Sequence, residues 1–137
     1  MARPRAPLSR RQARRQALVL LYQWDLTGQE FGTLYDGAID DHARQLAEAV
    51  REKAPALDER ITAAAEGWTA DRLGTVERNV LRLAIHEIES KAVPFEIAVN
   101  EAVVLAKRYA NDTAGRLVNG ILGRIGREQR VREREAL

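Results

Sequence analysis

Residues 74–88, with the sequence GTVERNVLRLAIHEI, carry the strongest helical pattern in the chain. Gly74 breaks the preceding segment, and Thr75 is a suitable N-cap for a helix that we expect to reach about Ser90. Apolar side chains cover a wide arc of this helix, at Val76, Val80, Leu81, Leu83, Ala84, Ile85 and Ile88. Because a surface helix buries only one stripe, so wide an arc predicts a helix at the centre of the domain.

Helical spacing of apolar residues recurs on both sides of this segment, and we find no strand-like alternation over six residues. The pattern predicts further helices over residues 9–27, 36–53, 55–66, 94–110 and 113–126. Gly28, Pro55 and Gly67 are expected to separate helices. A single helical turn is expected within residues 69–73, and Trp68 should fold back into the core. Six or seven helices joined by short loops predict an all-α fold.

The length of 137 residues suits one domain. We assign residues 9–126 to a single all-α domain, preceded by a flexible basic N-terminus (1–8). A charged tail (127–137) follows, which is either a frayed helix or disordered. The chain has no Cys, which excludes disulfide scaffolds, zinc–thiolate sites and thiol nucleophiles. No apolar run approaches the ~20 residues of a membrane span, and no signal peptide is recognisable, so we expect a cytoplasmic protein.

The net charge of +2 is an average over two different parts of the chain. The first 16 residues hold six Arg and no acid, whereas the other 121 hold 16 basic and 20 acidic residues. A basic arm on a mildly acidic domain indicates a polyanion as partner. The alternative is a disordered Arg-rich start that binds nothing.

Residues suited to catalysis or metal binding are scarce. His42 and His86 lie on different expected helices without the HExxH spacing, so we expect no metal site. Phosphate-loop and nucleophile motifs are absent as well, so we predict no catalytic residue and no cofactor. Gly120, Gly123 and Gly126 recur inside a helix, where they favour close packing of helices or, at Gly120, the approach of RNA to the backbone. The pattern favours a binding protein over a small all-α metabolite enzyme, and a protein-only helical adaptor whose Arg tract is idle stays open as an alternative.

Four stretches stand in the order and at the spacings of a known family: RRQARRQALVLLYQWDLTG (10–28), GTVERNVLRLAIHEI (74–88), VPFEIAVNEAVVLAKRYA (93–110) and LVNGILGRI (117–125). They resemble the NusB family of transcription antitermination factors. The resemblance implies about seven helices in two subdomains, and binding to the boxA element of rRNA leader RNA jointly with NusE, a ribosomal protein of the small subunit. It further implies assembly with NusA, NusG and RNA polymerase, no catalysis, and in some members a homodimer. The fold also occurs in certain rRNA cytosine-5 methyltransferases, but this chain is short for one and lacks the Cys that they use.

The resemblance also implies roles for residues of the first and central helices. Arg10, Arg11 and Arg14 match the family's arginine-rich motif and are expected to contact phosphates. Tyr22 matches a tyrosine near the RNA path, and it is expected either to stack on a base or to be a half-buried core phenol. Glu77 matches an acidic position near the RNA and partner surfaces, with a solvated first-turn acid as the alternative.

In the last expected helix the sequence departs from the family pattern. The family often has Asp at the position of Thr113 and Phe at that of Leu117, both implicated in RNA contact. Asp112 is one residue away and could substitute, whereas Leu117 offers apolar contact but no aromatic stack. Arg116 stands where Lys is usual and is expected to contact a phosphate, while Gly120 is expected to admit RNA.

The NusE surface implied by the resemblance lies on the central helix and its neighbours. We expect its contacts at Glu77, Arg78, Leu81 and Arg82. A wide apolar face also fits simple burial, so periodicity leaves partner contact and core packing open for these positions.

Overall fold

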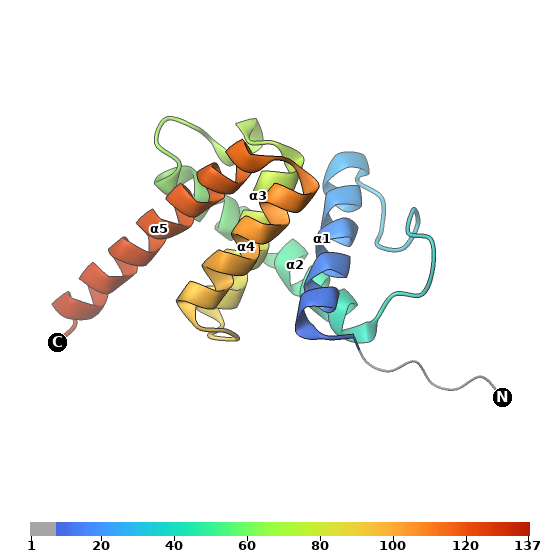
Figure 1. Cartoon of the computed structure of the whole chain (residues 1–137), viewed down its shortest axis with the longest axis horizontal. Coiled ribbons are helices and arrows are strands. Elements are labelled where there is room, and N and C mark those ends of the chain that lie inside the picture. The colour runs from blue at the N-terminus through green and yellow to red at the C-terminus, as the bar shows by residue number, and fades with distance from the viewer. Residues whose placement is uncertain (1–7) are drawn as a thin grey trace.

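The computed structural model describes residues 8–137, and α3 (Thr75–Glu89) lies at the centre of the fold (Figure 1). Nine of its 15 residues are buried, which confirms that its wide apolar arc marks a central helix. The helices packed around it are α1 (Arg10–Thr27), α2 (Asp41–Ala64), α4 (Phe95–Tyr109) and α5 (Asp112–Glu135). Residues 1–7, which belong to the expected flexible N-terminus, lie outside the described residues.

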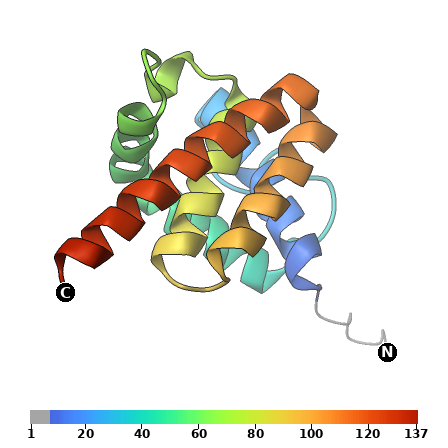
Figure 2. The same ribbon diagram turned by 60° about the vertical axis from the view of Figure 1, so that its left-hand side comes forward.

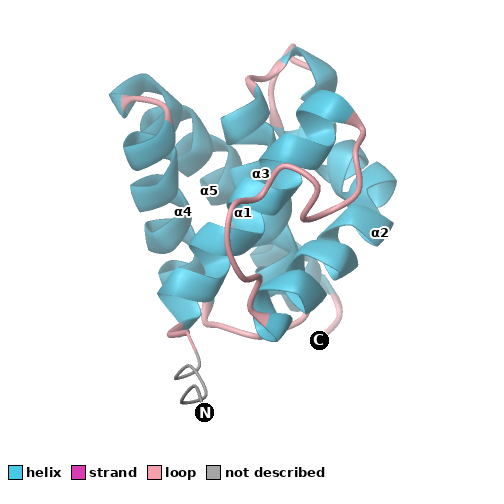
Figure 3. Cartoon of the chain, turned by 90° about the vertical axis from the view of Figure 1, so that its right-hand side faces the viewer, coloured by secondary structure: helices cyan, strands magenta, loops and turns pink. Residues whose placement is uncertain are grey.

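The all-α class is confirmed, because residues 8–137 form helices joined by loops and contain no strand (Figure 3). Within these residues there are five α-helices and not about seven. The turn expected within residues 69–73 is a short 3-10 helix, η1 (Ala70–Arg72). None of the described helices is both long and apolar enough to cross a membrane.

The count differs mainly because α2 is one helix where two were expected. Pro55 has no N–H to donate and its ring crowds the carbonyl of Arg51, which normally ends or kinks a helix. The helix nevertheless passes through Pro55, and it begins only after Asp40, whose side chain accepts the N–H of Ala43 at 3.1 Å. Residues on both sides of the proline bury one continuous face: Ala43, Ala47, Val50, Ala54, Leu57 and Ile61. Burial of this face outweighs the ~3 kcal/mol that an internal proline costs.

Both ends of α1 follow the sequence prediction. The Ser9 hydroxyl accepts the N–H of Gln12 at 3.2 Å, and the Gln12 side chain accepts the N–H of Ser9 at 2.9 Å. This reciprocal capping satisfies two N–H groups that a bare helix end leaves unpaired. At the other end Gly28 adopts a left-handed φ of 73° and its N–H donates to the carbonyl of Trp24 at 2.7 Å. The arginine-rich first turns therefore belong to a well-capped helix.

The last helix, α5, extends to Glu135, so the segment after residue 126 continues as helix (Figure 2). Of its three regularly spaced glycines, only Gly126 permits a close approach, because a Cβ there would overlap the ring of Phe95. A Cβ on Gly120 would face open space, and one on Gly123 would meet only Arg127, at an ordinary 3.5 Å. The expectation of close helix packing is therefore wrong for Gly120 and Gly123.

One hydrophobic cluster runs through all five α-helices, from Leu21 in α1 to Leu122 in α5. Trp68 is not part of it, since its side chain is 54% exposed, and the expectation that it folds into the core is wrong. The chain turns sharply after α2, with Gly67 at a φ of 81°. The N–H of Trp68 donates to the carbonyl of Ala65 at 2.7 Å. This turn holds the indole at the surface.

Candidate RNA-binding surface

Arg10 and Arg11 are exposed at the N-terminal end of α1, as a phosphate contact requires. Arg10 donates from Nη1 to the carbonyl of Ala92 at 3.0 Å, in the loop between α3 and α4. Arg11 donates from Nε to Oε1 of Glu101 at 2.9 Å, yet its side chain is 73% exposed. Since a guanidinium has five N–H donors, both residues keep donors that an anion can reach.

Arg14 is buried, so the expected phosphate contact is wrong for this arginine. Its Nε and Nη2 atoms each donate to the Glu87 carboxylate at 2.7 Å, and its Nη1 lies 3.5 Å from Glu101. Burial opposes the charge on Arg14, but the hydrogen bonds and charge of Glu87 and the charge of Glu101 outweigh it and raise the pKa of the guanidinium. Arg14 therefore ties α1 to α3 and α4 and holds the turn that carries Arg10 and Arg11.

A groove of about 310 Å³ lies between α1, the start of α3 and the end of α4. Its lining comprises Leu18, Val19, Tyr22, Gln23, Val76 and Tyr109. Tyr22 is 37% exposed and Tyr109 is 39% exposed, so both residues are partly accessible from solvent. The Arg108 guanidinium lies 5.7 Å from the centre of the Tyr109 ring. Because successive helical residues turn by about 100°, Arg11, Arg15 and Tyr22 share one face of α1.

The first turn of α5 adjoins this groove, since only two residues separate Tyr109 from Asp112. Asp112 and Thr113 are both exposed there, and the acid suits a helix N-terminus. Asn111 caps the helix by accepting the N–H of Ala114 at 2.8 Å. The two expected RNA contacts of this turn thus stand on a fixed and accessible backbone.

Further along α5 a second groove, of about 450 Å³, brings together three of the expected RNA contacts. Arg116 is exposed and donates to the Thr113 hydroxyl at 3.3 Å, Leu117 is half-buried, and Gly120 leaves its backbone uncovered. The rest of the lining is Ala64, Ala65, Glu66, Trp68, Ile121, Arg124 and Arg127. The last helix therefore presents a basic face beside an exposed indole.

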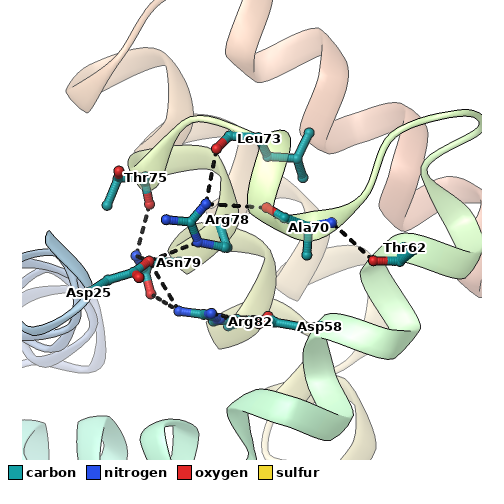
Figure 4. A network of polar contacts seen from close by, with 9 residues as sticks. All are labelled: Asp25, Asp58, Thr62, Ala70, Leu73, Thr75, Arg78, Asn79 and Arg82. Carbon is teal, nitrogen blue, oxygen red and sulfur yellow. Dashed lines mark hydrogen bonds and ion pairs between the residues drawn. The ribbon is translucent and has the colours of Figure 1, made fainter. Parts of the chain in front are cut away.

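Asp25, near the end of α1, is the centre of an internal polar network (Figure 4). Its Oδ2 accepts from Arg78 at 2.8 Å, from Asn79 at 2.9 Å and from Arg82 at 3.2 Å. Arg82 also donates from Nε and Nη2 to the two carboxylate oxygens of Asp58 in α2, each at 2.7 Å. Burial raises the pKa of Asp25, but the hydrogen bonds from Arg78 and Asn79 and the charge of Arg82 outweigh it, so its pKa lies below the ordinary value. The network fastens α1 and α2 to α3.

This network and the burial of α3 overturn part of the expected NusE surface. Leu81 is fully buried and Arg82 is only 5% exposed, because the central helix turns both side chains inward. Arg78 is committed as well, since its Nε donates to Asp25 and its Nη1 donates to two backbone carbonyls around η1. Glu77 remains partly exposed, with its carboxylate folded back over Gly74. Of the four expected contacts, Glu77 alone stays available to a partner.

Sequence reasoning missed four residues that the structure places at these grooves: Trp68, Tyr109, Arg124 and Arg127. Helical spacing could have found Arg124 and Arg127, because both repeat the face of Arg116 and Gly120. The exposure of Trp68 and Tyr109 depends on a turn and a helix end that periodicity does not describe.

Exposed arginines beside half-exposed aromatic rings are the surface of a protein that binds nucleic acid. Among residues 8–137 no three His, Asp or Glu side chains converge to hold a metal ion. The fold and this surface together define a small all-α nucleic-acid-binding protein.

Comparison with known proteins supplies the family. The NusB family model matches residues 11–127. The transcription antitermination protein NusB of Pelotomaculum thermopropionicum is 38% identical over 128 residues, spanning 86% of this chain and 89% of the relative. The chain belongs to the NusB family of transcription antitermination proteins, as its four sequence stretches predict, and it is an antitermination factor, not an enzyme.

Solved structures agree with this assignment. NusB of T. maritima superposes with a TM-score of 0.77 at 32% identity, covering 90% of this chain and 94% of that one. A chain from the crystal structure of the antitermination factors NusB and NusE in complex with double-stranded RNA superposes with a TM-score of 0.70 at 30% identity. That match covers 83% of this chain and 92% of the other.

Proposed function

We propose that this protein binds the boxA element of rRNA leader RNA jointly with NusE and so supports rRNA transcription. One observation carries the proposal: exposed Arg11 and half-exposed Tyr22 share a face of α1, which leads to the exposed first turn of α5. The related NusB whose structure includes NusE and double-stranded RNA supports it. The complex would act in the cytoplasm, together with NusA, NusG and RNA polymerase.

Phosphate binding falls to the accessible arginines. Arg10, Arg11 and Arg116 each offer guanidinium N–H groups for charge-assisted bonds to phosphate oxygens. Arg11 can exchange Glu101 for a phosphate at little cost, because exposed ion pairs contribute at most about 1 kcal/mol. Arg14 acts as a positioning residue that holds the first turns of α1 against α3.

Base recognition falls to the tyrosine groove and the start of α5. The partly exposed Tyr22 and Tyr109 line one groove and offer aromatic rings on which an unpaired base can stack. Asp112 and Thr113 offer oxygen acceptors for base amino groups on the adjoining turn. Leu117 contributes apolar contact without the aromatic stack of its relatives, so selectivity rests more on the tyrosines in this chain.

NusE would bind where an acidic surface remains available. Apart from its first 16 residues the chain carries four more acids than bases, which suits a basic ribosomal protein. Glu77 is the contact that we retain for NusE, since Arg78, Leu81 and Arg82 are committed to the interior. A homodimer is the competing use of such a surface, and light scattering at two concentrations with and without RNA distinguishes the two.

The salt dependence of boxA binding tests the arginine contacts. About four neutralised phosphates give a slope near −3 for log K against log salt, at ~0.7 per contact on a single strand. Replacing both Arg10 and Arg11 by Ala should flatten this slope by more than one unit in fluorescence anisotropy. The matched control removes two other exposed arginines, Arg72 and Arg132, and should leave the slope unchanged. An unaltered slope in the Arg10 and Arg11 variant would contradict the assignment.

A further inference from the structure

The basic face of α5 continues beyond the residues that the family resemblance identifies. Residues three, four and seven positions apart lie on the same side of a helix. Arg124 and Arg127 therefore share the face of Arg116, Leu117 and Gly120, and all five line one groove together with Trp68. The basic face expected to bind RNA therefore extends about two helical turns beyond Gly120, to Arg127.

Trp68 is unusual within this groove. Large aromatic side chains normally bury most of their surface, yet 54% of this one is exposed. No described arginine is stacked on its ring, unlike the rings of Phe31, Trp24 and Tyr109. The Gly67 turn and the hydrogen bond from its N–H to the carbonyl of Ala65 fix its backbone at the surface.

The charges around the indole favour an anionic occupant. Three arginines, Arg116, Arg124 and Arg127, face one acid, Glu66. Arg124 forms an exposed ion pair with Glu66, and Arg127 is exposed and has no ion-pair partner among the described residues. Gly120 lies between these arginines with its backbone uncovered. Guanidinium groups beside a free aromatic face are the elements that bind phosphates and bases of a single strand.

We propose that this groove holds a continuation of the single-stranded RNA beyond the boxA contacts, with one base stacked on Trp68. Arg124 and Arg127 hold the flanking phosphates, and the bare backbone at Gly120 admits the strand. Glu66 gives up Arg124 to the phosphate when RNA is bound. This inference rests on the proposed function, because it lengthens the path that starts at α1.

Two oligonucleotides separate the groove from the rest of the path, one trimmed to the boxA element and one extended by flanking leader sequence. Trp68→Ala should weaken binding of the longer RNA by about fivefold to a hundredfold, the range for loss of one stacked base, and leave the shorter RNA unaffected. Trp68→Phe keeps a ring and should restore most of the affinity. Thermal melts of both variants show whether the fold is kept. Equal affinity of wild type and Trp68→Ala for the longer RNA would overturn the inference.

Charge and fluorescence give independent readouts of the same contact. Arg124→Gln with Arg127→Gln should flatten the salt slope for the longer RNA by more than one unit, at ~0.7 per phosphate, whereas Arg132→Gln on another side of α5 should not. Stacking on Trp68 should quench tryptophan fluorescence when the longer RNA binds. The Trp68→Phe variant keeps only the partly buried Trp24, and its fluorescence should not be quenched. Quenching that persists in Trp68→Phe would contradict stacking at this site.

Comparison with wild type tells the two proposals apart. If wild type binds both RNAs and the groove variants match it, the groove inference alone fails. If wild type binds neither RNA even with NusE present, the proposed function fails and the inference falls with it. A single-stranded DNA of the longer sequence, bound as tightly as the RNA, would show that the groove accepts any single strand and would overturn its assignment to leader RNA.

Discussion

The arginines of α1 have different roles although they stand within one short tract. Arg11 is exposed and pairs with the largely covered Glu101, whereas Arg14 is buried against Glu87. The contrast is one of helical geometry, because three residues turn the side chain from solvent towards α3. A basic tract therefore indicates a polyanion surface without showing which guanidinium groups reach it.

Substitution of the two arginines should separate binding from stability. Arg14→Ala leaves Glu87 buried without its partner and should lower the free energy of unfolding by about 3–5 kcal/mol. Arg11→Ala should lower it by less than about 1 kcal/mol and weaken boxA binding instead. Urea unfolding and anisotropy on both variants check this. A stability loss of the same size in both would refute the distinction.

His86 makes the stability of the protein depend on pH. Burial, together with the positive charge of Lys53, holds the pKa of His86 below its ordinary value despite the opposing charge of Glu87, and its Nδ1 is buried without a hydrogen bond among the described residues. The folded protein therefore favours the neutral ring, while the unfolded chain takes up a proton near pH 6.5.

This contribution to stability is fully present above that pH and is lost as the pH falls below it. Urea midpoints measured from about pH 7.5 to 5.5 should decrease for wild type and decrease less for His86→Gln. Parallel curves for the two proteins would show that His86 does not titrate differently in the folded state.

At the scale of elements, Gly120 and Gly126 of α5 allow the same substitution to be compared in two different surroundings. Gly120→Ala adds a methyl group in open space and removes the entropic cost of glycine in a helix, so it should stabilise the protein by up to about 1 kcal/mol. Gly126→Ala drives the same methyl group into the ring of Phe95 and should destabilise it, by about 1–3 kcal/mol. Thermal unfolding measures both. Shifts of the same sign would contradict the packing of α5 against α4.

The same elements show how far sequence predicts this fold. The capping of α1 by Ser9 and its end at Gly28 are local chemistry, and they are readable because the interacting atoms are close in sequence. Continuation of α2 through Pro55 depends on a face buried against other helices, which local rules do not contain. The exposure of Trp68 likewise depends on tertiary structure.

The predicted site residues also fall into two groups, those that the structure leaves exposed and those that tertiary packing turns inward. Arg10, Arg11 and the first turn of α5 are exposed, so their proposed roles stay compatible with the structure. Arg78, Leu81 and Arg82 face inward, because other helices pack around most of the central helix. Helix periodicity identifies that α3 is central, and yet it cannot say which of its polar residues are paired inside.

For the whole molecule, the unequal division of charge has a structural counterpart. Many acidic side chains hold helices together, through Glu87 with Arg14 and Asp25 with Arg78 and Arg82, while accessible arginines collect on α1 and α5. The internal pairs connect the helices, and the accessible basic groups are left for a polyanion. The arrangement suits a binding protein that presents one strand of RNA and a second protein together.

Joint binding of boxA RNA and NusE is therefore the property to measure. A fluorescence anisotropy titration of a boxA oligonucleotide with this protein, with and without NusE, reports it directly. We expect NusE to lower the Kd at least about fivefold, which corresponds to a coupling of about 1 kcal/mol between the two partners. An identical Kd in the presence and absence of NusE, or no binding in either case, would contradict the proposed function.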